Sequence, residues 1–386
     1  MMSLVFSFVL TFLSVLQSAA APVGVTLPDW QEGMLDIHAI NTGSGECSFI
    51  IFPDGTTLLV DAGDLYGYTP PNYSKVPARP SGEEQPWRTY ADYIRHFLPE
   101  GRTHLDYCLL THYHIDHFGF TGEGRTMHES GNYALAGLMG LYSEVPFDVL
   151  IDRSSPDYPE CDENSSTANY IRFVKYNSEH GSLRVERFEL GSDTQMAPRY
   201  RPELCPDFHI FGYAASGLVW DGRNVVDTKA RYENGMSCAF LLSYGKFDYF
   251  SSGDMNQRNT CSAVAKSIGR KLEAMKAHHH LTNEASYAIE SSVYQPQVVV
   301  THCFYERDIQ PNQSIIKNYS GTQDMFFTNL PMTLVESSPE IYKDCKCTGG
   351  HLVIRVAPDG EFYVYVLDDT DKQYKIKSVH GPYKSE

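Results

Sequence analysis

The chain has 386 residues, with 48 Asp and Glu against 31 Lys and Arg, which gives a net charge of −17 at pH 7. Such an acidic protein repels polyanions, so we expect no large nucleic-acid surface; any nucleic acid would have to be held by bound metal and a local basic patch. The length allows one elaborated domain or two.

The first 21 residues have the pattern of a cleaved signal peptide. They hold no charged side chain, and an apolar run from Leu4 to Leu16 is followed by small residues and then Pro22. An uncleaved anchor is the alternative, although the run is short for a membrane span, and no later segment is apolar enough to cross a bilayer. Secretion as a glycoprotein agrees with four Asn-x-Ser sequons, at Asn72, Asn164, Asn312 and Asn318.

Nine cysteines in a chain of this size do not form a disulfide framework, and an odd number leaves at least one thiol unpaired or intermolecular. Three lie in apolar strand-like runs and are expected in the core: Cys47, Cys108 and Cys238. Four lie among polar loop residues, where oxidised pairing is plausible without a deducible connectivity: Cys161, Cys205, Cys345 and Cys347.

The mature chain begins with hairpin-connected strands, predicted over 34–41, 47–52 and 57–60. The third strand ends in Asp61-Ala62-Gly63-Asp64, where an acidic residue and a glycine suit a loop that passes close to a buried site. The Pro- and Tyr-rich stretch 65–87 is predicted to be an insertion near the mouth of that site.

A helix predicted over 87–98 is followed by a strand over 105–110, which runs into Thr111-His112-Tyr113-His114-Ile115-Asp116-His117. Four potential metal ligands thus fall within six residues. In an extended chain His112 and His114 point the same way, and Asp116 with His117 can wrap round a second position as the chain turns. Imidazole and carboxylate groups suit zinc and similar divalent ions, and an adjacent pair of ions would polarise a substrate and generate hydroxide. A chance cluster on a surface loop is the alternative.

The rest of the chain alternates predicted strands and helices. Helices are predicted over 134–142, 168–176, 261–269 and 284–294, and strands over 147–151, 208–213, 239–244, 247–250, 272–277 and 298–300. The polar segment 152–181 is predicted to be a second insertion. A final hairpin over 351–356 and 361–367 is followed by polar residues to the end.

Three of these strands end in residues that can carry chemistry. The strand 247–250 ends in Ser251-Ser252-Gly253-Asp254, where a carboxylate after a glycine is well placed to bridge two cations. The strand 272–277 runs into His278, His279 and His280, which could also be a solvated loop or an adventitious metal patch. His302 follows the strand 298–300.

Taken in order, the hairpin with Asp61, the HxHxDH motif, Asp254, the histidine cluster and His302 resemble the metallo-β-lactamase superfamily over nearly all of the mature chain. The resemblance implies an α+β fold, a four-layer αβ/βα sandwich, in one domain over 22–386, with two sheets face to face, helices outside and metals at one edge. It implies one or two zinc ions, with manganese possible.

The resemblance also implies roles by position. His112 and His114 would bind one ion, Asp116 and His117 the other, Asp254 would bridge them, and His302 would complete the second site. Asp61 would support the ligands from behind. The implied catalytic residues are Asp116 and His280, with His280 as the proton donor to the leaving group and His279 as the alternate.

One ligand that the family usually supplies is missing. A third histidine for the first ion is expected after the strand 208–213, where Ala214, Ala215 and Ser216 stand, and His209 lies too early. Asp152, Asn234 or water would fill the gap, or the first ion would bind weakly.

Three runs, IHAINTGSGECSFIIFPDGTTLLVDAGD, NGMSCAFLLSYGKFDYFSSGD and HHH, are similar to the hydrolase domain of bacterial competence-type DNA uptake proteins. This implies cleavage of a phosphodiester such as a nucleotide, a nucleic acid or a phospholipid headgroup, and the acidity favours a small substrate. A lactone, thioester or amide hydrolase of the same fold stays open, because bound hydroxide attacks a carbonyl carbon as readily. So does a non-catalytic secreted binding protein with an incomplete metal site.

Overall fold

The computed structural model describes residues 20–386 except 73, 83, 283–286, 307–309, 320 and 348. All but the last two residues of the expected signal peptide therefore lie outside the described residues. Within the described part, no helix is long and apolar enough to cross a membrane.

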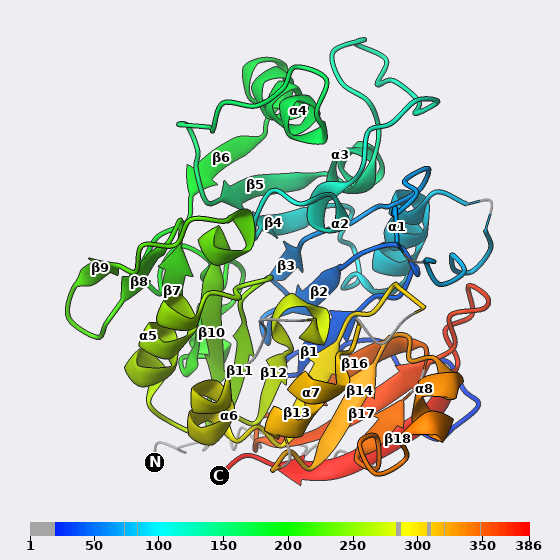
Figure 1. The fold of residues 1–386 in the computed structure, drawn as a ribbon, viewed down its shortest axis with the longest axis vertical. Helices are drawn as coiled ribbons and strands as arrows, with labels where there is room; N and C mark the ends of the chain where they lie inside the picture. The colour runs from blue at the N-terminus through cyan, green and yellow to red at the C-terminus, as the bar shows by residue number, and fades with distance from the viewer. Residues whose placement is uncertain are drawn as a thin grey trace, which may run out of the picture.

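Two mixed sheets, each of nine strands within the described residues, form the framework (Figure 1). The first has the strand order β18-β17-β16-β1-β2-β3-β4-β5-β6, and the second β15-β14-β13-β12-β11-β10-β7-β8-β9. The first sheet comprises β1 (Leu35–Ala39), β2 (Ser48–Ile51), β3 (Thr57–Val60), β4 (Leu105–Leu110), β5 (Phe147–Asp152), β6 (Arg184–Arg187), β16 (His351–Val356), β17 (Glu361–Leu367) and β18 (Ile376–Lys384). The second comprises β7 (Phe208–Ala215), β8 (Leu218–Trp220), β9 (Val225–Asp227), β10 (Ala239–Tyr244), β11 (Phe247–Ser251), β12 (Ala274–Lys276), β13 (Val298–Thr301), β14 (Asp324–Phe327) and β15 (Cys345–Cys347).

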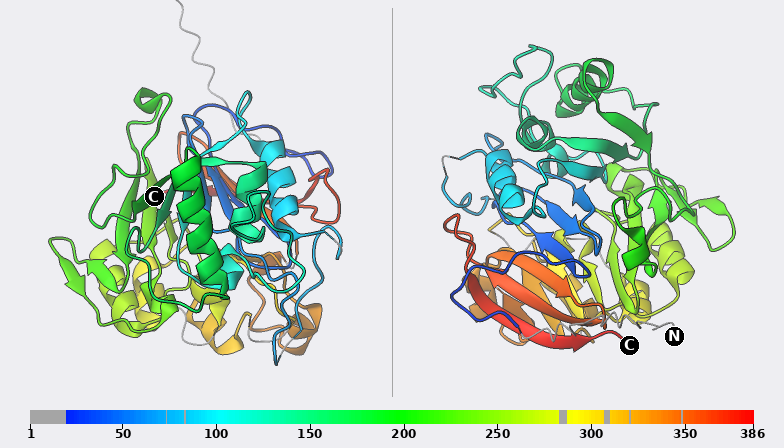
Figure 2. Two further views of the ribbon diagram at one scale, coloured as in Figure 1. Left: turned by 90° about the horizontal axis from the view of Figure 1, so that it is seen from above. Right: turned by 180° about the vertical axis from the view of Figure 1, so that it is seen from behind.

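Helices cover the outer face of each sheet (Figure 2). The first sheet is covered by α1 (Pro86–Phe97), α3 (Gly137–Glu144) and α4 (Ser166–His180). The second is covered by α5 (Arg258–Ile268), α6 (Ala288–Tyr294), α7 (Gln313–Ile316) and α8 (Met332–Ser337). The short α2 (Ile115–Phe118) and the 3-10 turns η1 (Pro202–Leu204), η2 (Glu233–Met236), η3 (His278–Leu281) and η4 (Lys317–Tyr319) lie in connections.

Three apolar cores separate these four layers. Alternate residues of one strand face opposite sides of its sheet, so Phe49 of β2 packs under the helices of the first sheet while Ile50 packs between the sheets. Phe240 joins Ile50 in the central core, and Phe250 of β11 packs under α5. The four-layer αβ/βα sandwich predicted from the sequence is therefore confirmed.

Parallel strands set the position of the site. In the first sheet β3, β4 and β5 run parallel, and in the second β11, β12 and β13 do. Their carboxyl ends lie at one edge of each sheet, and polar residues follow them there.

Most predicted elements are confirmed, five strands with unchanged bounds: 57–60, 105–110, 239–244, 351–356 and 361–367. The helix predicted over 284–294 is described only from Ala288, because 284–286 lie outside the described residues. One strand was not predicted: only polar residues were expected after the final hairpin. Residues 376–384 form β18, which pairs with β17 and buries Ile376 and Tyr383.

The loop segments and cysteines complete the comparison. Segment 65–87 leads into α1 and segment 152–181 contains α4, and their origin as insertions stays a prediction. Cys47, Cys108 and Cys238 are buried, as predicted. All nine cysteines, including the four considered for pairing, are free thiols in the structure.

Candidate metal centre

Residues that follow five strands meet at the shared edge of the two sheets. Asp61 follows β3, His112 follows β4, Asp254 follows β11, the three histidines of η3 follow β12, and His302 follows β13. The site therefore draws on both halves of the sequence, as the sequence pattern predicted.

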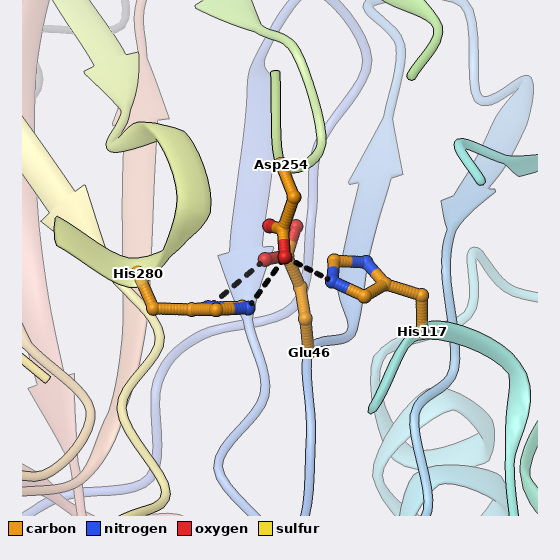
Figure 3. A group of neighbouring side chains, drawn as sticks. All are labelled: Glu46, His117, Asp254 and His280. Atoms are coloured by element: carbon orange, nitrogen blue, oxygen red, sulfur yellow. Dashed lines mark ion pairs between the residues drawn. The ribbon is translucent and has the colours of Figure 1, made fainter. Parts of the chain in front are cut away.

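One group of buried side chains could hold an ion: Glu46, His117, Asp254 and His280 (Figure 3). Asp254 Oδ2 lies 3.1 Å from His117 Nε2 and 3.3 Å from His280 Nε2. Asp116 also reaches this group, with its Oδ2 3.6 Å from His280 Nε2.

Hydrogen bonds on the far sides of the two imidazoles fix how they face the group. His117 Nδ1 donates to Asp61 Oδ2 at 2.8 Å, and His280 Nδ1 donates to the carbonyl oxygen of His302 at 3.1 Å. Each Nε2 is buried and has no hydrogen-bond partner. Histidines that ligate metals are commonly held this way, with one nitrogen bonded to the protein and the other free for the ion.

Asp61 adopts a backbone conformation that its contacts enforce. Its φ of +60° lies in the left-handed region, which costs a non-glycine residue roughly 1–2 kcal/mol. Its carboxylate accepts hydrogen bonds from the backbone N of Thr111 at 2.8 Å and from Thr111 Oγ1 at 2.7 Å, besides the one from His117. These three bonds link the end of β3 to the HxHxDH segment.

A second group shares Asp254 with the first: His112, His114 and Asp254. His112 Nε2 lies 3.1 Å from His114 Nδ1 and 3.9 Å from Asp254 Oδ2. Asp254 Oδ2 therefore lies between two histidine groups, where a carboxylate could bridge two ions.

The spacing of the first group fits a small divalent ion. Ligands about 2.0–2.1 Å from a tetrahedral zinc lie roughly 3.3–3.4 Å from one another. The separations of Asp254 Oδ2 from His117 Nε2, 3.1 Å, and from His280 Nε2, 3.3 Å, fall close to that value, and Asp116 Oδ2, next to the group, lies 3.6 Å from His280 Nε2. With the two orphaned Nε2 atoms, this donor set fits zinc, whereas the second group is looser.

Close backbone contacts explain two glycines of the site. A Cβ at Gly63 would lie 1.8 Å from the carbonyl oxygen of Asp116, and one at Gly45 would lie 2.8 Å from it. The loops after β3 and before β2 can therefore approach the HxHxDH segment only without side chains at these positions.

The charges of the site are strongly coupled. Burial alone lowers the pKa of His117 and of His280, but Asp254 and neighbouring carboxylates outweigh it, raising His117 well above its usual pKa and the pKa of His280 to about 9. Burial and the adjacent histidines lower the pKa of His112 well below its usual value. The carboxylates around His117 and His280 thus favour the protonated imidazoles, and binding of an ion would compete with those protons.

The structure does not bring His302 into either group. Its Nε2 lies 3.2 Å from Ser48 Oγ, and its Nδ1 is buried without a hydrogen-bond partner. It contributes its carbonyl oxygen to His280 instead. His280, and not His302, lies beside His117 and Asp254; the metal-ligand role implied for His302 and the proton-donor role implied for His280 stay predictions.

Asp152 and Asn234, which were considered as replacements for the missing third histidine, and His209 lie in different surroundings. Asp152 already accepts four hydrogen bonds, from the backbone N of Ser154 and Ser155 and the hydroxyls of Tyr158 and Tyr170. Asn234 Nδ2 lies 3.0 Å from His279 Nε2, at the edge of the centre. His209 is exposed on β7.

The histidine cluster bends through a left-handed turn. His279, His280 and Leu281 have φ values of +46°, +52° and +56°. His278 anchors the turn, because its Nδ1 contacts Ser252 Oγ and its Nε2 lies 2.8 Å from Glu290 Oε1. His279 Nε2 lies 4.0 Å from Asp254 Oδ2, and 22% of its side chain is exposed.

Two buried charged residues of the centre were not predicted. Glu46 precedes β2, and Lys276 ends β12 with only 1% of its side chain exposed. A single lysine in the apolar strand predicted over 272–277 was the signal that could have identified Lys276.

The fold and the site together define a class: a four-layer αβ/βα protein whose strand ends carry a histidine and carboxylate centre suited to divalent ions. No family model and no curated protein matches the sequence. Structural similarity extends to CmlA, a diiron β-hydroxylase from Streptomyces venezuelae, at 12% identity and a TM-score of 0.38, covering 86% of this chain and 55% of that one. It extends to Zn²⁺-bound PqqB from Methylobacterium extorquens at 10% identity and a TM-score of 0.41, covering 83% of this chain and 99% of that one.

Human tRNase Z in its short form is also similar, at 10% identity and a TM-score of 0.36, covering 83% of this chain and 98% of that one. The present chain thus spans about half the length of the hydroxylase and nearly the full length of the other two. Because all three are distant, the chemistry proposed below is derived from the residues of the site itself.

Proposed function

We propose that this chain is a secreted, metal-dependent hydrolase of the metallo-β-lactamase fold that cleaves a small phosphodiester. One observation carries the proposal. Separate strand ends bring two buried imidazole nitrogens without hydrogen-bond partners to within 3.3 Å of one carboxylate oxygen, Asp254 Oδ2.

In this proposal the four residues around the tighter position, Asp116, His117, Asp254 and His280, hold one zinc ion, or manganese in its place. His112, His114 and Asp254 hold a second ion. Ions held there would polarise a substrate oxygen and lower the pKa of a bound water.

The surrounding residues hold these groups in place. Asp61 and the carbonyl of His302 orient His117 and His280 through their Nδ1 atoms. Only 1% of the His280 side chain is exposed, and its Nε2 faces Asp254 Oδ2 at 3.3 Å, so in this proposal His280 holds the ion and does not protonate a leaving group. His279, whose side chain is 22% exposed and lies within hydrogen-bond distance of Asn234 and Thr282, takes the substrate-facing role.

A small phosphodiester is favoured for two reasons. The sequence resembles a phosphodiester-cleaving branch, and the net charge of −17 disfavours long polyanions. The expected signal peptide and sequons support secretion.

Metal content and turnover of the mature wild type test the proposal beside His112→Ala and Asp254→Ala. His209→Ala is the control, because His209 is exposed on β7 and belongs to neither group. We expect zinc and hydrolysis of bis-p-nitrophenyl phosphate in the wild type and control, with loss of metal and turnover in both site variants. If the wild type hydrolysed only a lactone, thioester, amide or β-lactam, the proposed phosphodiester substrate would be wrong and the enzyme would be a hydrolase of carbonyl substrates. A wild type without metal or turnover would overturn the proposal in favour of a binding protein.

A further inference from the structure

A buried ammonium group lies inside the candidate metal centre. Lys276 Nζ is 2.7 Å from Glu46 Oε2, 2.6 Å from the carbonyl oxygen of Gly253 and 3.5 Å from Asp254 Oδ1. The side chains of Lys276 and Glu46 are each 1% exposed, and that of Asp254 is 2% exposed. Three oxygens thus surround a cation that the chain itself supplies.

The two oxygens of Asp254 consequently face different cations. Oδ1 faces Lys276, while Oδ2 faces His117 and His280. Because a carboxylate is rigid, an ammonium group beside one oxygen fixes the direction of the other. The loop that carries Asp254 is held by the same group, through the carbonyl of Gly253.

Glu46 has two possible roles in this arrangement. Its carboxylate lies near His117, Asp254 and His280, and both of its oxygens are buried without a hydrogen-bond partner, so Glu46 could be a metal ligand. Its shortest contact is with Lys276, and His280 Nδ1 is farther from the same oxygen, at 3.5 Å. A buried lysine needs a counter-charge, and Glu46 is the nearest one.

We propose that Lys276 is a positioning residue whose ammonium group serves as a resident monovalent cation of the centre, holding Asp254 so that Oδ2 alone faces the ions. Glu46 is its counter-ion and not a metal ligand. This inference rests on the proposed function, since it assigns a role within the same centre.

Chemical rescue of Lys276→Ala tests the role of Lys276. The substitution removes the atoms of an n-propylammonium ion, so that ion can enter the space and restore the contacts. We expect zinc affinity, measured by competition with a chromophoric chelator, to fall about 10–100-fold, the usual effect of losing an outer partner of the ligands. Millimolar n-propylammonium should recover most of this loss, whereas tetramethylammonium, which has the same charge and no N–H group, should not.

Glu46→Gln tests the counter-ion role, because it removes the charge that faces Lys276 and keeps the size of the side chain. The same titration should find as many zinc ions in Glu46→Gln as in the wild type, whereas Asp116→Asn should lose one. Wild-type zinc affinity in Lys276→Ala, a loss without rescue, or a missing ion in Glu46→Gln would each overturn the inference.

If Lys276→Ala does not fold, the double variant Glu46→Gln/Lys276→Met replaces the pair by neutral residues of similar size. We then expect a folded protein with zinc bound about 10–100-fold more weakly than in the wild type, and unchanged affinity would overturn the inference. These results are distinguishable from a failure of the proposed function, which would appear in the wild type itself as an absence of both bound zinc and turnover.

Discussion

Replacing Asp61 by Asn should weaken metal binding although Asp61 touches no ion. The carboxylate accepts three hydrogen bonds, from Thr111 N, Thr111 Oγ1 and His117 Nδ1, and two of these share Oδ2. An amide has one accepting oxygen, so its NH₂ group must face at least one of these donors. The left-handed backbone is retained, because Asn tolerates it.

The size of the effect follows from these contacts. A buried donor left without a partner costs about 1–3 kcal/mol of stability. Loss of the partner that orients a histidine ligand lowers metal affinity about 10–100-fold, or roughly 1.4–2.8 kcal/mol. Both effects are expected in Asp61→Asn, because His117 would lose its fixed orientation.

Calorimetric zinc titration and urea unfolding of the metal-free protein measure the two effects separately. Asp106→Asn is a matched control, because Asp106 Oδ2 accepts equivalent hydrogen bonds from Thr57 N and Thr57 Oγ1 at the other end of β4. The control should lose stability and keep its zinc affinity. Equal zinc affinity in Asp61→Asn and the wild type would refute the assignment of Asp61 as the residue that orients His117.

Three further outcomes are expected. Gly63→Ala should lose zinc binding and have a lower melting temperature, because its Cβ would lie 1.8 Å from the carbonyl oxygen of Asp116. Gly82→Ala is the control, because a Cβ there would meet open space. Equal melting temperatures of the two variants would contradict this contact. Burial holds the pKa of His351 at about 3, against an ordinary value of 6.5, and its Nδ1 accepts from the backbone N of Asn41. The unfolded chain therefore binds the extra proton as pH falls from 6.5 towards 3, so stability should fall by up to about 1.4 kcal/mol per pH unit, and His351→Gln should flatten this slope. Zinc at a hundred times its Kd should stabilise the protein by about 2.7 kcal/mol, and EDTA should remove that gain. A melting temperature, measured by calorimetry, that changes with neither zinc nor EDTA would contradict a metal site.

The sequence predicted the layers well because their signals are local. Apolar runs that end at glycine and acidic residues marked β3 and β11, and one that ends at the HxHxDH motif marked β4; each strand is buried on both faces. It failed for β18, whose buried residues Ile376 and Tyr383 do not alternate with polar ones in a regular pattern. Its strand conformation depends on hydrogen bonds to β17, which no local pattern records.

The candidate centre was predictable to the extent that ligands follow strands. The HxHxDH segment and Asp254 lie together as the motif spacing indicated. The sequence could not predict that His280, and not His302, lies beside Asp254. This position depends on the left-handed turn of η3, which directs the His280 ring towards Asp254. Glu46 and Lys276 were missed since their pairing joins residues more than two hundred positions apart.

The return of the last strands to the first sheet has a consequence for biosynthesis. β1 lies between β2 and β16, so its second neighbour is made more than three hundred residues later. A nascent chain without residues 351–384 exposes one edge of β1 as unpaired backbone, a site for wrong pairing with other chains. The first sheet can therefore be completed only after residues 351–384 have been synthesised, and truncation before residue 351 should yield aggregates rather than a shortened native protein.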